Sequence, residues 1–302
     1  MKFYENIENE RERIQNCIRR FGWTSDHNLD WFIDCIVSKD GRPVFVEFSD
    51  GTGLLAHRYK DKWRIWSDPL CEKQSAPDKI FKFADRVLNN EIRKVWCDDV
   101  SDTIYSELKK SSSLLIDDIY YSLQWPVLDM DKYDLTLPGG HFKDIRNAKN
   151  KFYREHNVQV VSSSEIKKED LYNIFANWKN VISQKQDEKD ISDLKYHNAI
   201  ENNFRAFLTA RVFVVDGRPV GLNAGYEVPN VTNRFAGIIG IHDYSTREAG
   251  LMLWLEDLDW IKNTGYKELD MQGDEGGGGL EFKMQFGPII ERKTDTFSIQ
   301  RK

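Results

Sequence analysis

Residues 265–288, GYKELDMQGDEGGGGLEFKMQFGP, contain an apolar run, four consecutive glycines and a second apolar run that carries Lys283. The first run predicts a strand and the second a short helix, so the glycines form the loop between them. A nucleoside triphosphate loop needs Lys and Ser or Thr where its glycines enter the helix. This stretch has no Ser or Thr, and Asp274 and Glu275 precede the glycines. We therefore expect a flexible loop that leads into a helix bearing Lys283.

The segments before this stretch predict a mixed sheet. Three apolar segments within residues 210–243 are separated by short turns, which indicates an antiparallel meander. A strongly apolar helix follows over residues 247–265, and Gly265 ends it. This helix should cross over to the strand at 266–272, which we expect to pair in parallel with the end of the meander. Further helices are predicted at 139–156, 164–185 and 194–208.

The first half of the chain has a similar order. Strands are predicted at 42–50, 63–69 and 92–99, and a helix is predicted at 76–91. The pentapeptide DGRPV occurs at 40–44 and again at 216–220, each time between apolar segments. Asp-Gly suits the turn of a hairpin, so the two copies mark either two unrelated hairpins or two copies of one αβ unit. A duplication would place the boundary near residues 126–138.

Composition limits the class of protein. The chain has 302 residues, of which 40% are hydrophobic, and a net charge of -6. The length favours one large or two medium domains, and the acidic balance argues against a nucleic-acid binder on bulk charge. No CxxC motif occurs, so buried free thiols are expected at Cys17, Cys35, Cys71 and Cys97. No apolar run approaches the roughly 20 residues of a membrane span, so a soluble, cytoplasmic protein is expected.

The order of elements resembles the fold of the Gcn5-related N-acetyltransferases (GNAT). Its doubled form resembles the Fem-type aminoacyltransferases and the soluble catalytic domain of phosphatidylglycerol lysyltransferase. Three segments carry the resemblance: YDLTLPGGHFKDIRNAKNKFYREHNVQVV at 133–161, the stretch at 265–288 and, more weakly, WRIWSDPLCEK at 63–73. It implies an α/β (α+β) protein of two tandem GNAT-like units, each a mixed central sheet flanked by helices. The N-terminal domain would span residues 1–130, and a domain at 131–302 would carry the active site.

The resemblance implies an acyltransferase or aminoacyltransferase. The group would pass from an activated donor to an amine or hydroxyl, such as that of a lipid headgroup or a peptide. No tightly bound cofactor or metal is implied, because the donor itself, aminoacyl-tRNA or acyl-CoA, is a substrate. The alternatives are an acetyl-CoA-dependent N-acetyltransferase and a non-catalytic ligand-binding module.

The loop before the helix at 247–265 bears on the choice of donor. GNAT enzymes that bind acetyl-CoA carry a [QR]-x-x-G-x-[GA] motif there, whose backbone N–H groups hold the pyrophosphate. Arg247 and Gly250 match this motif, but Met252 does not, and Glu248 brings a negative charge. This departure favours aminoacyl-tRNA as the donor, with Arg247 as a substrate contact. Alternatively, Ser245 or Thr246 simply caps the helix.

The helix at 141–155 has a cationic face opposite an apolar side formed by Ile145, Ala148 and Phe152. That face carries Lys143, Arg146, Asn147, Asn150 and Arg154. Such a face can hold the phosphates of a tRNA acceptor end or a lipid headgroup, or it can be a solvated surface. With the resemblance, substrate contacts are expected from Lys143, Arg146 and Asn150.

Candidate catalytic residues come from two places. The resemblance implies that Lys283 points into the reaction centre and stabilises an oxyanion there, whereas the pattern alone fits a surface lysine. His242 and Asp243 end the third strand of the meander and are candidate bases, although a half-buried structural role is the alternative. The loop beside Lys283 supplies three candidate substrate contacts. Gln272 and Asp274 could hold an α-amine, and Gly277 could leave space for the substrate.

Overall fold

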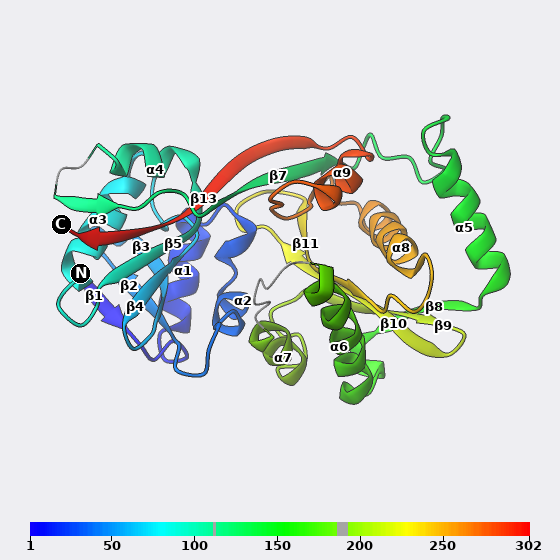
Figure 1. Cartoon of the computed structure of the whole chain (residues 1–302), viewed down its shortest axis with the longest axis horizontal. Coiled ribbons are helices and arrows are strands. Elements are labelled where there is room, and N and C mark those ends of the chain that lie inside the picture. The colour runs from blue at the N-terminus through cyan, green and yellow to red at the C-terminus, as the bar shows by residue number, and fades with distance from the viewer. Residues whose placement is uncertain (111–112, 186–192) are drawn as a thin grey trace. The chain divides into compact units, whose positions relative to one another are not determined.

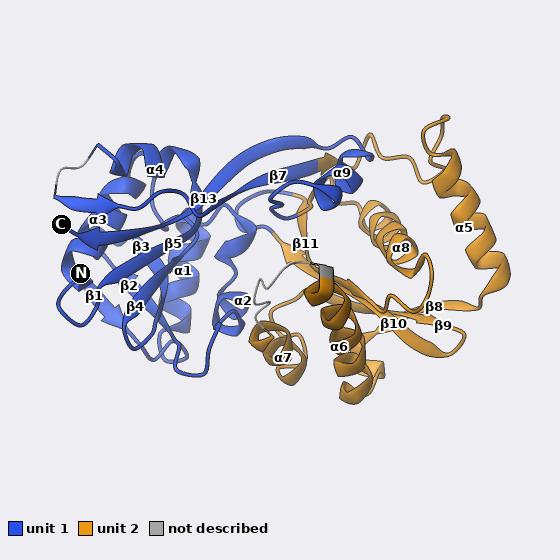
Figure 2. Ribbon diagram, viewed as in Figure 1, with its two compact units in different colours: residues 1–127, 228–232, 272–302 blue, residues 128–227, 233–271 orange. Residues whose placement is uncertain are grey.

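The computed structural model describes residues 1–110, 113–185 and 193–302. The chain divides into two compact units, which Figure 2 shows in different colours. Unit 1 comprises Met1–Val127, Val228–Thr232 and Gln272–Lys302, and unit 2 comprises Leu128–Glu227 and Asn233–Met271. The domains expected at 1–130 and 131–302 differ from these units chiefly at 228–232 and 272–302.

Unit 1 is built on a mixed sheet (Figure 1). The first four strands are antiparallel, β4 and β5 are parallel, and β13 is antiparallel to β5, β6 and β7. In spatial order the strands are β1 (Lys2–Tyr4), β2 (Arg42–Glu47), β3 (Gly53–Arg58), β4 (Lys62–Trp66), β5 (Lys94–Ser101), β13 (Ile289–Arg301) and β7 (Tyr121–Asp129), with β6 (Leu114–Ile116) also on β13.

Apolar clusters hold the helices of unit 1 to its sheet. The crossover helix α3 (Ala76–Val87) buries Ile80 and Phe83 in a cluster with residues of β2, β4 and β5. The helices α1 (Arg11–Phe21) and α2 (Leu29–Asp34) join a second cluster with Phe45 and Leu55. The remaining helices are α4 (Asp102–Leu108), α9 (Gly278–Met284) and the short 3-10 turns η1 (Ser25–His27) and η2 (Lys73–Ser75). The four cysteines are buried and free, as expected.

Unit 2 repeats this plan. Its strands lie in the order β8 (Val158–Ser162), β9 (Thr209–Val215), β10 (Arg218–Glu227), β11 (Arg234–His242) and β12 (Glu268–Asp270). The expected meander is confirmed, and so is the crossover, since α8 (Ala249–Thr264) links β11 to the parallel strand β12. The other helices are α5 (Lys143–Glu155), α6 (Lys168–Lys185), α7 (Leu194–Glu201) and the 3-10 turn η3 (Ser163–Glu165).

Each unit therefore contains a meander, a crossover helix and a parallel strand, which confirms two αβ units. The DGRPV pentapeptides do not mark this duplication. Asp216 and Gly217, with φ of 52° and 78°, form the hairpin turn between β9 and β10. In the first copy, Asp40 and Gly41 instead precede β2, the strand that corresponds to β9, and the residues before them form no strand. The expectation that both copies are hairpin turns is therefore wrong for residues 40–44.

Candidate functional site

The pairing of the parallel strands β4 and β5 of unit 1 ends at their carboxyl ends. Their last paired residues are Trp66 and Asp98, and the next residue on each strand, Ser67 and Asp99, is left-handed with φ of 60° and 52°. Residues other than glycine rarely adopt this conformation, and those that do concentrate at functional sites. The carboxyl ends of parallel strands are also where open α/β sheets bind ligands. The polar side chains at this edge are therefore candidates for a functional site.

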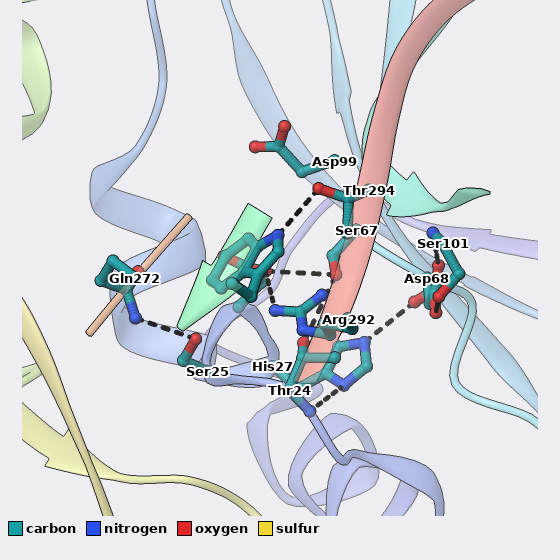
Figure 3. A network of polar contacts seen from close by, with 12 residues as sticks. Thr24, Ser25, His27, Ser67, Asp68, Asp99, Ser101, Gln272, Arg292 and Thr294 are labelled. Carbon is teal, nitrogen blue, oxygen red and sulfur yellow. Dashed lines mark hydrogen bonds and ion pairs between the residues drawn. The ribbon is translucent and has the colours of Figure 1, made fainter. Parts of the chain in front are cut away.

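Arg292 of β13 lies at the centre of this polar network (Figure 3). Its guanidinium carbon is 3.6 Å from the ring centroid of Trp125, the residue opposite it on β7. Its Nη2 is 3.6 Å from the carboxylate of Asp26, which is too far for a hydrogen bond. Both terminal nitrogens are buried and have no hydrogen-bond partner within the described part of the chain. A buried guanidinium without acceptors is costly, and a carboxylate, phosphate or oxyanion would supply them.

Asp99 adds a carboxyl group to the same network. Its backbone N–H donates to Oγ1 of Thr296 at 3.1 Å, and that hydroxyl lies 3.2 Å from Oδ1 of Asp99. The pKa of Asp99 is raised to about 7, chiefly by burial and further by the neighbouring carboxylates of Asp26 and Asp98. A carboxyl group with such a pKa can accept a proton near neutral pH, as a general base requires.

A histidine fixes the position of Asp26. His27 accepts hydrogen bonds at Nδ1 from the backbone N–H groups of Trp23 and Thr24, so its Nε2–H donates to the carbonyl of Asp68 at 2.9 Å. Burial lowers the pKa of His27 to about 4, which keeps the ring neutral. The ring therefore ties η1, and Asp26 within it, to the segment that follows β4.

The glycine-rich loop reaches this network through Gln272. The amide Nε2 of Gln272 donates to Oγ of Ser25 at 3.0 Å (Figure 3). Two residues later, the backbone of Asp274 pairs with that of Gln124 on β7, with both N–O distances at 2.9 Å. The start of the loop is thus anchored to unit 1 rather than free.

Lys283 lies against the same loop. Its Nζ is 3.2 Å from the carbonyl oxygen of Gln272 and 3.2 Å from Oδ2 of Asp274. The structure therefore brings together Lys283, Gln272 and Asp274, three of the residues expected from sequence. Gly277, with φ of 73°, is the N-cap of α9 and lets the chain turn into the helix that bears Lys283.

In unit 2, Asp243 stabilises a turn. Its carboxylate accepts hydrogen bonds from Nη1 of Arg218 at 2.6 Å and from the backbone N–H and hydroxyl of Ser245 at 2.8 and 2.9 Å. Burial alone would raise the pKa of Asp243, but the bonds from Ser245 and Arg218 hold it below its ordinary value. A carboxylate held in this way is a poor proton acceptor at neutral pH.

The position of His242 explains why residue 250, which matches a glycine of the acetyl-CoA motif, is a glycine. A Cβ on Gly250 would lie 2.5 Å from Cε1 of His242, so glycine makes room for the imidazole ring. The backbone N–H groups of Ser245, Thr246 and Ala249 already donate to acceptors within this loop. Those three groups are therefore engaged rather than open to a pyrophosphate.

Part of the cationic side of α5 lies beside the loop that precedes α8. Arg247 and Lys151 line one hollow of about 270 Å³, together with Asn147 and His156. Lys143 and Asn150 are exposed elsewhere on the helix, and Arg146 donates to the carbonyls of Leu137 and Gly139. Of the basic residues expected to bind phosphate, only Arg247 lines this hollow.

Comparison with known proteins supports the fold. No protein-family model matches the chain, and no curated protein matches its sequence. A structure from Agrobacterium fabrum, described as the C-terminal domain of a putative lysylphosphatidylglycerol synthetase, aligns over 98% of this chain and 92% of its own, with 15% identity and a TM-score of 0.65.

Further solved structures align over most of their length. A Bacteroides thetaiotaomicron protein of unknown function covers 100% of both chains with 18% identity and a TM-score of 0.65. The L-PGS of Bacillus licheniformis covers 96% of this chain and 91% of its own, with 16% identity and a TM-score of 0.62. A tandem GNAT protein from the clavulanic acid pathway has 9% identity and a TM-score of 0.57 over 98% and 97%. The chain has a tandem GNAT fold, which confirms the resemblance drawn from its sequence.

Arg292, Trp125, Asp26 and Asp99 lie outside the residues expected from sequence. The sequence of β13 does carry a signal that could have identified Arg292. Polar side chains occupy every second position from Arg292 to Ser298, and the strand is buried from Thr294 to Ser298. A signal for Asp99 is the acidic pair that directly follows the apolar start of β5. A polar stripe on a buried strand requires polar partners, which is what the structure places beside it.

Proposed function

We propose that this protein is an acyltransferase or aminoacyltransferase whose reacting carbonyl lies beside Arg292. The observation that carries the proposal is the guanidinium of Arg292 at the carboxyl ends of β4 and β5, whose two terminal nitrogens are buried and have no hydrogen-bond acceptor among the described residues. Preorganised donors aimed at a developing oxyanion are the largest source of rate enhancement in acyl transfer. Arg292 is fixed by its stacking on Trp125 and would not need to reorganise.

The reaction would use Asp99 as its base. The nitrogen or oxygen of the acceptor bonds to the acyl carbon, and its proton passes to the carboxylate of Asp99. The bond between the acyl carbon and the donor oxygen or sulfur then breaks, and the proton returns to that leaving atom. Lys283 is the second cation near the loop, and its expected role at the oxyanion is part of this proposal. His242 belongs to unit 2 and is the candidate base of a reaction within that unit, where Asp243 is disfavoured because its pKa is lowered.

The donor favoured by this proposal is aminoacyl-tRNA. The engaged N–H groups before α8 and the carboxylate of Glu248 disfavour the pyrophosphate of acyl-CoA. Within unit 2, phosphates of a tRNA would contact Arg247 and the exposed Lys143 and Asn150 of α5. Arg146 is engaged by backbone carbonyls and is the weaker candidate of that helix.

The loop anchored by Gln272 would receive the aminoacyl group. Gln272 offers its side chain beside Ser25, and Asp274 would attract an α-ammonium group, although Lys283 competes for the same carboxylate. Two of the similar structures are described as a putative lysylphosphatidylglycerol synthetase domain and as L-PGS. These descriptions support a lipid headgroup as the acceptor, with a peptide amine as the alternative.

Donor depletion tests the proposal. The purified protein is incubated with a mixture of charged tRNAs and, separately, with acyl-CoAs, in the presence of anionic lipid vesicles or an amine. The proposal predicts loss of an aminoacyl-tRNA at a rate above that of spontaneous hydrolysis. Loss of acetyl-CoA instead would establish the acetyltransferase alternative. Stability of every donor would contradict transferase activity and leave a ligand-binding module.

A further inference from the structure

Unit 2 contains a second hollow, of about 580 Å³, beside the edge strand β8. Its volume falls within the range of small-molecule sites. Ser162 and Arg211, which face each other in the β8–β9 register, are among its lining residues. Strand β9 runs parallel to β11, because both are antiparallel to β10, so the start of β9 lies at the edge of the sheet opposite His242. The hollow is thus separate from the loop before α8.

One charged side chain, Arg211, is present among the described residues that line this hollow. Its guanidinium carbon is 4.6 Å from the ring centroid of Trp260, and its Nη2 donates to the buried carboxylate of Asp257. Its Nε and Nη1 donate no hydrogen bond within the described chain, and Nε is buried. A planar guanidinium held by stacking is preorganised for a carboxylate. Asp257 already offsets the charge of Arg211, so the matching ligand carries no more than one negative charge and binds through the guanidinium N–H groups that Asp257 does not use.

The rest of the lining combines polar groups with large apolar side chains. Leu208 is 60% exposed and Val160 is 37% exposed, although both are large apolar side chains. The rings of Phe204 and Phe207 lie 6.0 Å apart in the same lining. Asn203 and Phe204 are consecutive left-handed residues, with φ of 51° and 55°. Exposed apolar side chains gathered around a hollow, next to strained backbone, are typical of a ligand site.

We infer that this hollow binds a small amphipathic carboxylate, with its apolar body on Val160, Phe207 and Leu208 and its anionic group on Arg211. Hydroxyl groups of Ser162, Ser163 and Ser164 lie on the same lining and can share the carboxylate. The inference does not depend on the proposed transferase activity, because it rests on residues of a different edge of the sheet.

Isothermal titration calorimetry with three probes that each carry a ten-carbon chain tests the charge requirement. Decanoate should bind, decanol should bind about ten-fold more weakly because it lacks the charged acceptor, and decyltrimethylammonium should not bind. Across octanoate, nonanoate and decanoate the affinity should rise roughly four-fold per methylene, as expected for burial of each group in the hollow. Equal binding of decanol and decanoate would overturn the assignment of a carboxylate.

A matched pair of variants tests whether decanoate binds in this hollow. Leu208→Glu and Leu208→Lys change the same exposed side chain, so neither should disturb the fold, which thermal unfolding checks. The glutamate should weaken decanoate binding about five-fold or more through like-charge repulsion, and the lysine should preserve or strengthen it. Equal affinities for decanoate in the two variants would show that the ligand binds elsewhere.

Discussion

Replacement of Asp99 by asparagine should change how stability depends on pH. The folded protein raises the pKa of Asp99 from 3.8 to about 7, chiefly through burial, so folding favours its protonated form. Stability from this group is therefore fully present below about pH 4 and is lost as pH rises to about 7. The full shift corresponds to about 4 kcal/mol, and partial exposure of the side chain reduces our expectation to about 2 kcal/mol.

An asparagine side chain in place of Asp99 cannot ionise but keeps an oxygen that accepts from Thr296. Relative to wild type, Asp99→Asn should therefore gain about 2 kcal/mol in free energy of unfolding between about pH 4.5 and about pH 8. Urea unfolding at both pH values measures this difference. Asp118→Asn is the control, because the Asp118 side chain is fully exposed and should give the same difference at both pH values. An equal effect of Asp99→Asn at both pH values would refute the raised pKa.

Three other substitutions have defined outcomes. Arg292→Met keeps an apolar contact with Trp125 but leaves the carboxylate of Asp26, 3.6 Å away, without its cation, so the free energy of unfolding in urea should fall by about 1–3 kcal/mol; an unchanged value would contradict that ion pair. Gly250→Ala should lower that free energy by about 1–3 kcal/mol, since the new Cβ meets His242 at 2.5 Å; an unchanged value would contradict that contact. Asp274→Asn removes the ion pair with Lys283 and should cost about 1 kcal/mol or less, with a larger loss at low salt than at high salt; a loss independent of salt would contradict an ionic contact.

Much of the fold could be predicted from local patterns. The meander at 210–243 and the apolar crossover helix before residue 265 both have short-range signatures, namely turn residues and helical periodicity. Strand β3 was not among the predicted elements, although its interior is almost wholly buried. A strand buried on both faces lacks the alternation that identifies a half-exposed one.

The candidate site could be predicted only where its residues are near in sequence. Lys283, Gln272 and Asp274 belong to one stretch and meet in the structure. Arg292 and Trp125 meet because β13 pairs with β7, and no spacing rule links residues so far apart. The pKa of Asp99 depends likewise on Asp26, which lies on η1 and reaches the end of β5 only through tertiary packing.

The donor-depletion assay with wild type and Arg292→Met tests the central claim most directly. If Arg292 stabilises the oxyanion, the variant should remain folded at the assay temperature, which thermal unfolding checks, and consume the charged tRNA about 100-fold or more slowly. Asp118→Asn should consume it at the wild-type rate, because the Asp118 side chain is fully exposed and takes no part in the proposed reaction. Wild-type turnover of the donor by the folded Arg292→Met variant would contradict the account.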